Sequence, residues 1–577
     1  MRISHRLMLN AVAMSLFSVL ITSSAIGWIA YSQGSNVIKK NTMEHLISMR
    51  EIKKDEIERY FNNTREEILA LANDFTVIEA MKSFKASFKT YKDELDKIKP
   101  LSYNMNVIQK YIKSYQTEYK IKNSDEGELS GSKLFNLSRE SSFSLQYNYI
   151  LQNPYPIGKK QELNYVDDGT SYSQTHKKYH PRLNYFLKKL HYYDIFLIDD
   201  NSLDIVYTVY KEPDFTTSLI DGAFSNTGIA EVAKAIQKLN DQNATVLSDF
   251  APYAPSYDGE AAFIGAPIYD GNVKIGILAV QLPINVINQI MTNKERWQEV
   301  GLGETGETYL VGPDFRLRSM SRFFTEHPDD YLNMMSKIGI SDAIISEMRD
   351  KNTSIGLQPV STKGVENALR DHETGFGIFK DYRQIPVLSA YAPLNIPGLN
   401  WAIMSEIDEA EAFKPVYLLA IRIILFTAIV SFVMVFSSIL IAIKLAWKIS
   451  KPMEQISRLI QFISKDKDLT KRLPINSKDE LGEISMAIND LFDSLQQAFE
   501  ETVHSTTKVN KIAFELEELS GKIKNRPSNN VDKPNEFNID KLMGKKGKEL
   551  KVLSTKLRKL AKQFQIMEEK TDEMDTW

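Results

Sequence analysis

The stretch IILFTAIVSFVMVFSSILIAI, from Ile423 to Ile443, decides how this chain is organised. It contains no charged residue, is almost entirely aliphatic or Phe, and is bounded by Arg422 and Lys444. A helix needs about 20 apolar residues to cross the core of a bilayer, so the stretch is long enough to span a membrane. A core helix of a soluble protein is rarely so long and so apolar. We therefore predict a transmembrane helix over residues 416–444.

A second apolar stretch lies near the N-terminus. No charged residue occurs between Arg6 and Lys39, and the residues from Leu7 to Tyr31 are mostly apolar. The alternative interpretation is a cleaved secretory signal, whose apolar region is about 7–15 residues long. Here the apolar run is longer, and a helical pattern follows it directly. We predict a retained transmembrane helix over residues 7–32.

Basic residues beside the two spans predict the orientation. Lys and Arg concentrate on the cytoplasmic side of membrane helices. The N-terminal residues 1–6 and the chain after the second span are therefore predicted to be cytoplasmic, and residues 33–414 to lie outside. The chain should be a multi-pass protein of a bacterial inner membrane with a periplasmic domain. The residues that carry this inference are Arg2, Arg6, Lys444, Lys448 and Lys451.

Length and composition exclude several other classes of protein. A chain of 577 residues is too long for one domain. Its net charge of -3 does not support a nucleic-acid-binding surface. The absence of Cys excludes disulfides, thiolate metal sites and cysteine nucleophiles. We expect no nucleic-acid partner, no metal and no cofactor.

The region between the spans begins with a helical pattern over residues 37–91 and then contains two series of β-rich runs. In both series an Ala-Pro pair ends one strand, a turn follows, and a last apolar strand leads into a helix. This order predicts two PAS-like α/β modules, at residues 140–290 and 300–413, carried by one long helix. The expected strands are 194–199, 205–210, 261–268 and 274–282 in the first module, and 307–312, 315–317, 375–380, 387–393 and 399–407 in the second.

Four runs in this region resemble a known family, the double-Cache sensors of chemoreceptors and sensor kinases. They are His191–Asp199, Val209–Phe215, Gly301–Gly312 and Arg318–Phe323. The resemblance implies an α+β fold in which a long helix carries two PAS-like modules between membrane spans. It also implies that the membrane-distal module, here residues 140–290, holds a small ligand.

The candidate ligand-binding residues come from this distal module. The amino-acid-binding subfamily has an Arg-x-Trp-Tyr run, whereas the corresponding Arg182-Leu-Asn-Tyr185 lacks the Trp and places the Tyr one position late. Asp249 is the carboxylate expected to bind an amine. The full candidate set is Arg182, Tyr185, Tyr207, Lys211, Asp214, Asp249 and Tyr253.

Two histidines in the same region offer a second possible site. His176 and His180 are four residues apart in a helical stretch, so they share a face and could bind a metal. No nearby acidic residue completes that face. We therefore expect partly exposed helix histidines rather than metal ligands.

After the second span, apolar residues recur at three-four spacing, which is typical of a coiled coil. Pro452 and the run Asp479-Glu480-Leu-Gly482 make residues 445–498 similar to the HAMP relay domain, although Ser464–Leu469 lacks the connector glycine usual in HAMP. The resemblance implies a parallel four-helix bundle and hence a homodimer. The expected relay residues are Pro452, Met453, Ile456, Ile460, Glu480, Ile484, Ile488 and Leu491.

The remaining residues show three patterns. The coiled-coil spacing continues over 499–523, and residues 524–547 are rich in Lys, Asn, Pro and Gly, as flexible linkers are. Residues 548–577 predict an amphipathic helix. We expect that helix to pair with its copy in a dimer, to fold back on the HAMP helices, or to dock on another protein.

These features predict a transducer without catalysis, which senses a small periplasmic ligand and passes the signal through HAMP to a cytoplasmic signalling protein. The alternative is the sensor half of a truncated or split histidine kinase or nucleotide cyclase. Against it, His504 lacks the acidic residue and proline that follow a phosphoacceptor, and neither a Gly-rich nucleotide lid nor a cyclase loop occurs. A third possibility, an adhesive surface protein, would have no need of HAMP.

Overall fold

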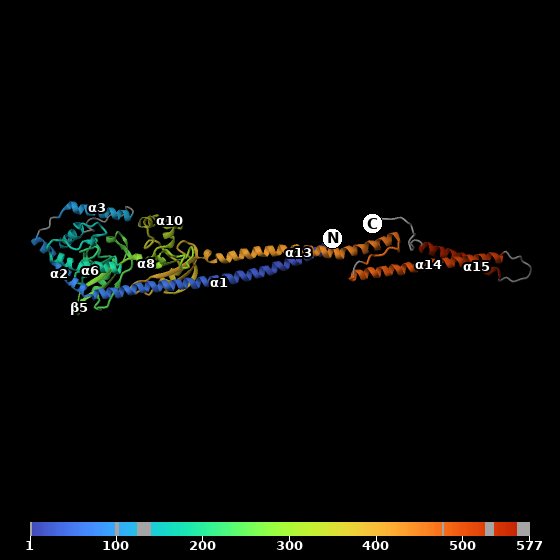
Figure 1. Cartoon of the computed structure of the whole chain (residues 1–577), viewed down its shortest axis with the longest axis horizontal. Coiled ribbons are helices and arrows are strands. Elements are labelled where there is room, and N and C mark those ends of the chain that lie inside the picture. Colours follow the sequence, from blue (N-terminus) through green and yellow to red (C-terminus); the bar gives the residue numbers. More distant parts are fainter. Residues whose placement is uncertain (1–2, 99–102, 124–139, 476–477, 525–535, 562–577) are drawn as a thin grey trace, which may run out of the picture. The chain divides into compact units, whose positions relative to one another are not determined.

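The computed structural model describes residues 3–98, 103–123, 140–475, 478–524 and 536–561 (Figure 1). The chain divides into two compact units, residues 31–419 and residues 1–30 together with 420–577. Each unit is described by itself below.

Two helices open the chain, where the sequence predicted one helix over 37–91. α1 (Ile3–Ala72) ends at a turn, and α2 (Phe75–Ile98) begins directly after it. The break has a local cause. Asp74 accepts hydrogen bonds from the backbone N–H groups of Thr76 at 2.8 Å and Val77 at 3.3 Å, and an Asp at this position starts a new helix.

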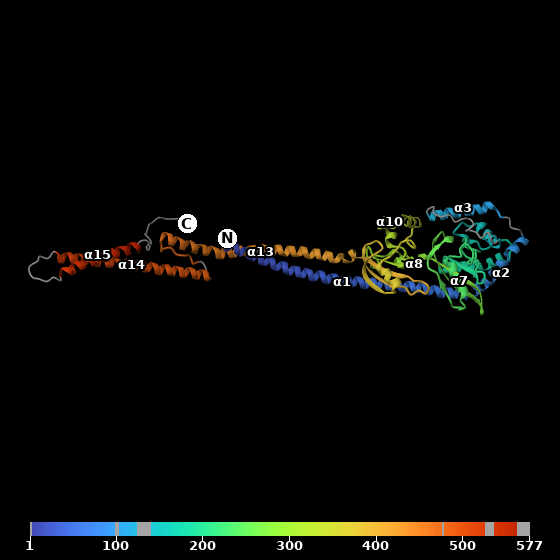
Figure 2. The same ribbon diagram turned by 180° about the vertical axis from the view of Figure 1, so that it is seen from behind.

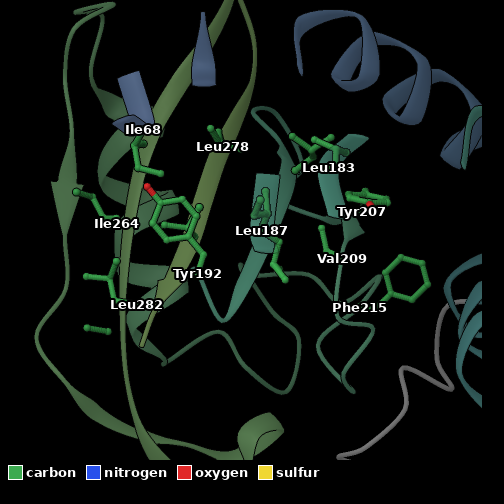
Figure 3. Close-up of a cluster of buried hydrophobic side chains, with 14 of the residues drawn as sticks. Ile68, Leu183, Leu187, Tyr192, Tyr207, Val209, Phe215, Ile264, Leu278 and Leu282 are labelled. Atoms are coloured by element: carbon green, nitrogen blue, oxygen red, sulfur yellow. The ribbon is translucent and has the colours of Figure 1, made fainter. Parts of the chain in front are cut away.

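The first α/β module of the larger unit is built on an antiparallel sheet with the strand order β2-β1-β6-β5-β3, and β4 pairs with β5. α7 covers one face of the sheet, and α2 and α6 cover the other. Figure 3 shows part of the core on the α2 and α6 side. The elements are α3 (Met105–Lys122), α5 (Glu140–Gln146), η1 (Tyr147–Leu151), η2 (Lys160–Glu162), α6 (Ser171–Leu190), β1 (Asp194–Asp199), β2 (Ile205–Thr208), α7 (Gly228–Lys238), β3 (Val246–Leu247), β4 (Ala251–Tyr253), η3 (Ala254–Ser256), β5 (Gly259–Asp270), β6 (Val273–Leu282), α8 (Ile284–Met291) and η4 (Asn293–Glu295).

The second module has a four-stranded antiparallel sheet with the order β7-β10-β9-β8. Its core lies between this sheet and four short helices. The elements are β7 (Glu307–Val311), α9 (Arg322–Glu326), α10 (Pro328–Lys337), α11 (Asp342–Lys351), α12 (Lys363–Arg370), β8 (Gly375–Lys380), β9 (Pro386–Pro393) and β10 (Ala402–Asp408). Residues 315–317 were expected to form a strand and do not, because Arg316 and Leu317 form only isolated bridges.

α1 packs against both modules, as the two views show (Figures 1 and 2). Leu46 and Met49 lie in a cluster with Leu388 of the second module, whereas Ile68 lies in the core of the first. The predicted fold class, two α/β modules on a long helix, is confirmed.

Helices make up most of the described residues of the other unit. It contains most of α13 (Glu409–Asp466), together with α14 (Glu480–Lys524) and α15 (Glu536–Ala561). α1 and α13 each contain a segment long and apolar enough to cross a membrane, consistent with the two predicted spans. In the connector between α13 and α14, Lys467 adopts a left-handed conformation with φ of 56°, close to where HAMP domains usually have a glycine.

α15 begins inside the segment that composition predicted to be a flexible linker. Residues 536–547 are helical, and 525–535 lie outside the described residues, as does the last part of the predicted helix, 562–577. Packing explains the correction, because Gly547 and Ser554 are buried against α14 and tertiary contacts override the low helix propensity of glycine. Within its described residues, α15 folds back on the 506–520 part of α14, beyond the predicted HAMP segment; pairing with a second copy and docking on another protein stay predictions.

Candidate ligand site

A cavity of about 100 Å³ lies in the first module, between α3 and the loop that follows β2. About 10–15 Å³ of such space holds one water molecule, so the cavity has room for a small polar ligand. The cavity is lined by Tyr111, Tyr115, Glu118, Ile157, Gly158, Lys160, Tyr193, Tyr210, Lys211, Glu212, Pro213, Pro255 and Tyr257.

The loop after β2 is fixed by a buried carboxylate. Asp194, at the start of β1, accepts hydrogen bonds from the backbone N–H groups of Val209 at 3.0 Å and Tyr210 at 2.9 Å, and from the Thr208 hydroxyl. Gln146 holds the other end of the loop by donating to the carbonyl of Phe215 at 2.8 Å. These contacts present the side chains of the loop to the cavity in one arrangement.

Lys211 and Glu212 place an amine and a carboxyl group at the cavity wall, and both residues are buried. The Lys211 ammonium donates to the Thr208 carbonyl and lies 4.2 Å from the centroid of the Tyr207 ring. Tyr207, labelled in Figure 3, belongs to the apolar layer beneath the loop. Burial lowers the pKa of Lys211, although Asp194 and Asp214 oppose the shift.

Glu212 accepts hydrogen bonds from the Tyr193 hydroxyl at 3.0 Å and the Ser256 hydroxyl at 2.8 Å. Burial, followed by the nearby Asp214 charge, raises the pKa of Glu212 well above its usual value. A carboxyl with a raised pKa and a lysine with a lowered pKa at one cavity wall are typical of functional sites.

A ladder of tyrosines from α3 forms the opposite wall. Tyr111 and Tyr115 lie on one face of the helix, and the Tyr115 ring stacks on Tyr257 with centroids 4.9 Å apart. The Tyr257 hydroxyl donates to Glu118 at 2.5 Å. Burial lowers the pKa of Lys160, at a third side of the cavity, to about 8.

The structure brings only part of the predicted ligand set together. Lys211 lines the cavity. Tyr207, Asp214 and Tyr253 are buried beside it, and the Tyr253 hydroxyl donates to Asp214 at 2.5 Å. Sequence reasoning missed Glu212 and the tyrosines of α3, although the four-residue spacing of Tyr111 and Tyr115 was a signal for one shared helix face.

The other three predicted residues lie elsewhere. Arg182 and Tyr185 are exposed on α6, where the guanidinium lies over the Phe186 ring at 4.5 Å. Asp249 is bound by Arg318 of the second module and by the indole N–H of Trp401 at 2.9 Å. The carboxylate of Asp249 is therefore engaged by protein groups outside the cavity.

His176 and His180 are fully buried, not partly exposed as expected. Their rings stack with centroids 4.3 Å apart. His176 Nδ1 is 2.6 Å from the Asn164 carbonyl, and His180 Nε2 is 2.7 Å from the Gln161 carbonyl. Burial lowers the pKa of His180 to about 3, so both rings are neutral packing groups that hold the 161–164 segment against α6.

The expected HAMP residues lie on α13 and α14 in the second unit. Ile456 is buried, and Pro452 and Ile488 are partly buried. Asn489 joins α14 to the connector through two hydrogen bonds with the backbone of Leu473, at 2.8 Å and 3.0 Å. The remaining relay residues are exposed in the single chain: Met453, Ile460, Glu480, Ile484 and Leu491.

Comparisons with known proteins agree with this organisation. The family model for the Cache domain matches residues 34–416, and that for the HAMP domain matches residues 444–497. The methyl-accepting chemotaxis protein PctB of Pseudomonas aeruginosa is 21% identical over 252 residues, which are 43% of this chain and 33% of PctB. The chain therefore spans about a third of the length of this curated relative.

Solved structures of sensor domains are also similar, at low identity. The ligand-binding domain of PctB in complex with L-Arg is 12% identical, with a TM-score of 0.25, over 58% of this chain and 94% of that domain. The periplasmic sensory domain of the Campylobacter jejuni chemoreceptor Tlp1 is 13% identical, with a TM-score of 0.28, over 53% of this chain and 94% of that domain.

Two α/β modules that match the Cache family, two helices long and apolar enough to cross a membrane, and a HAMP segment give the chain a chemoreceptor-like organisation. The Cache match covers more than half of the chain, and the chain belongs to the Cache domain family. The resemblances to double-Cache sensors and to HAMP that the sequence predicted are confirmed.

Proposed function

We propose that this protein is a transmembrane receptor whose distal cavity binds a small polar ligand and whose HAMP segment passes the signal to a cytoplasmic partner. The observation that carries the proposal is the cavity itself, with Lys211 and Glu212 on one wall and stacked tyrosines on the other. Burying a lysine and a carboxylate costs free energy unless each has a partner. Lys211 and Glu212 already have neutral hydrogen-bond partners, and a ligand that carries both an acidic and a basic group would add a charged partner for each.

Glu212 is the residue best placed to recognise a positively charged group on that ligand. Its two hydrogen bonds come from neutral hydroxyl groups, so a bound ammonium would provide the charge that an ionised carboxylate needs in a buried site. Lys211 and Lys160 offer positive charge to an acidic group on the same ligand. Amino acids, small amines and short carboxylic acids therefore form the first set of compounds to test.

A thermal-shift screen of the full chain in lipid nanodiscs tests the binding site. A ligand at 100 times its dissociation constant stabilises the folded protein by about 2.7 kcal/mol, which is readily detected. We expect Glu212→Gln to weaken binding of a hit at least about tenfold, a change of about 1.4 kcal/mol. The matched control is Glu231→Gln on α7, because Glu231 is an exposed carboxylate of the same module.

Two results would contradict this site. The first is a hit that Glu212→Gln leaves unchanged while Arg182→Ala, on the exposed face of α6, weakens it. The second is a complete screen of the three compound classes without any stabilising compound. The first result would restore the residues that the sequence predicted.

The proposal includes the orientation in the membrane. Lys444, Lys448 and Lys451 follow the second apolar segment and favour the cytoplasm for everything after it. Reporter fusions at Asp408 and Lys478 should show periplasmic and cytoplasmic activity, respectively. The reverse pattern would place the cavity inside the cell and remove the basis for a periplasmic receptor.

A further inference from the structure

The second module contains two buried glutamates that the ligand site does not use. Glu307 on β7 and Glu406 on β10 are directly opposite each other in the antiparallel register. Glu307 is 2% exposed and Glu406 is 3% exposed. Like charges at directly opposed positions of two strands destabilise the pair, so two ionised carboxylates here would repel each other in a poorly solvated place.

Both carboxyl groups are bound by neutral donors. Glu307 accepts from the Tyr382 hydroxyl at 2.5 Å and from the backbone N–H of Arg322 at 3.0 Å. Glu406 accepts from the Tyr309 hydroxyl and the Ser389 hydroxyl, each at 2.7 Å. Within the described ranges, neither glutamate forms an ion pair within 4.0 Å.

The charged groups around the pair are engaged with other partners. Arg383, in the turn after β8, is paired with Asp381 and with Asp408 at the end of β10. Arg322, on α9, is paired with Glu326 at 3.0 Å and donates to two backbone carbonyls of the loop before β7. The titratable groups that face the pair from the remaining elements are Tyr309 of β7, Tyr331 of α10 and Tyr382 of the turn after β8.

Burial raises the pKa of Glu307 to about 7, against the opposing effect of Arg383. Burial and the Asp381 charge raise the pKa of Glu406 to about 8. The two groups therefore hold protons in the folded protein at a pH where an exposed glutamate has lost its own.

The pair is connected directly to the helix that leads to the membrane. β10 ends at Asp408, and α13 begins at the next residue, Glu409. Glu411, in the first turn of α13, accepts hydrogen bonds from the backbone N–H groups of Glu304 at 2.8 Å and Thr305 at 2.7 Å, just before β7. β10 is therefore continuous with α13, and the loop that leads into β7 is hydrogen-bonded to the first turn of α13.

We propose that Glu307 and Glu406 form a proton-binding site through which external pH sets the position of β10 against β7, and thereby the first turn of α13. This input is separate from the distal cavity and does not require the ligand. The receptor would thus report pH as well as ligand.

The sign of the effect follows from linkage. A carboxyl group whose pKa is higher in the folded state than in the unfolded state favours the folded arrangement at low pH, and this advantage is lost as pH rises through the folded pKa. Proton loss near neutrality should therefore loosen the contact between β7 and β10, whereas acid should tighten it.

The test uses the full chain in nanodiscs with an environment-sensitive fluorophore at Ala410→Cys. Ala410 is exposed in the first turn of α13, and the chain has no cysteine of its own. Fluorescence should change in a sigmoid between about pH 6 and about pH 9. Glu307→Gln or Glu406→Gln should move the midpoint to lower pH, because the remaining carboxyl no longer faces a like charge. The double Gln variant should show no transition.

Glu304→Gln is the matched control, because Glu304 is an exposed carboxylate in the loop before β7. It should leave the curve unchanged. The melting temperature at pH 6 checks folding, and the double Gln variant should keep it, since Gln imitates the protonated form. A flat curve for the parent protein, a transition that survives in the double variant, or a collapse of the double variant at pH 6 would each overturn the proposal.

Discussion

Asp249 joins the two modules through a single side chain. Its carboxylate accepts two hydrogen bonds from the Arg318 guanidinium, both at 3.1 Å, and one from the Trp401 indole. Paired guanidinium–carboxylate bonds of this kind are stronger than neutral hydrogen bonds. Arg318 is only 4% exposed, so its guanidinium has lost most of its contact with water. The Asp249 carboxylate replaces much of that lost hydration. Asp249 therefore helps to hold the module with the cavity to the module that leads into α13.

We predict that Asp249→Asn lowers the free energy of unfolding of the sensor by about 1–3 kcal/mol, because the buried Arg318 guanidinium loses the carboxylate that binds it through two hydrogen bonds. Asp314→Asn is the matched control, since Asp314 pairs with the same Arg318 at 3.0 Å but is 46% exposed. The control should cost less than about 1 kcal/mol. Thermal unfolding followed by circular dichroism measures both variants. Equal losses would show that Asp249 is no stronger a partner than a surface carboxylate.

Single residues were the hardest feature to predict from the sequence. Lys211, one of the residues predicted to bind a ligand, lines the cavity, but its neighbour Glu212 was not among the predicted residues. Asp249 was predicted to bind an amine, whereas its partner is Arg318, 69 residues further along the chain. The sequence does not show whether a carboxylate will pair with a ligand or with an arginine far along the chain. Only the folded structure distinguishes these two roles.

At the scale of the elements, prediction was more successful because hydrophobic periodicity is a local property. The run at 194–199 and the long runs that became β5 and β6 were recognised from their β-branched and aromatic residues. The predictions that were wrong depended on other signals. Asp74 ends a long helical pattern by capping a second helix, and α15 extends through two glycines because it packs on another helix.

α14 and α15 pack antiparallel to each other, and small residues lie at their contact. Ser554 donates to the Thr506 carbonyl at 2.6 Å, and Gly547 lies beside Ala513. Thr506, Ala513, Gly547 and Ser554 are all buried. Small side chains allow two helix backbones to approach closely. The predicted apolar stripe of α15 faces away from α14, since Leu550, Leu553, Leu557 and Leu560 are exposed.

We predict that Ala513→Leu separates α14 from α15, because overpacking a tight contact costs about 1–3 kcal/mol. The amide hydrogens of α15 should then exchange at least about tenfold faster with solvent. Ile512→Ala is the matched control at the adjacent position, where the side chain is 53% exposed. It should leave exchange in α15 unchanged. Unchanged exchange in Ala513→Leu would mean that α15 does not depend on this contact.

At the scale of the whole molecule, several apolar helix positions are exposed to solvent in a single chain. On α13 and α14 these include Ile460 at 47% exposed, Ile484 at 43% and Leu491 at 55%. They belong to the coiled-coil spacing that the sequence shows and to the residues matched by the HAMP family. An a/d seam of this kind is buried when helices from two chains pack side by side. We infer that a second copy of the chain covers these positions.

This inference predicts disulfide crosslinking between two copies. Leu491→Cys should crosslink symmetrically in membranes under mild oxidation. No other cysteine of the chain can contribute a crosslink, because the native sequence contains none. Asp490→Cys, one residue earlier and turned by about 100° around the helix, is the matched control and should crosslink poorly. Adding Ile488→Lys should reduce crosslinking at position 491 at least about tenfold, since a lysine in an apolar seam has no partner for its charge. Equal crosslinking at 490 and 491 would indicate random collision, and none at either position would contradict a dimer contact in the HAMP segment.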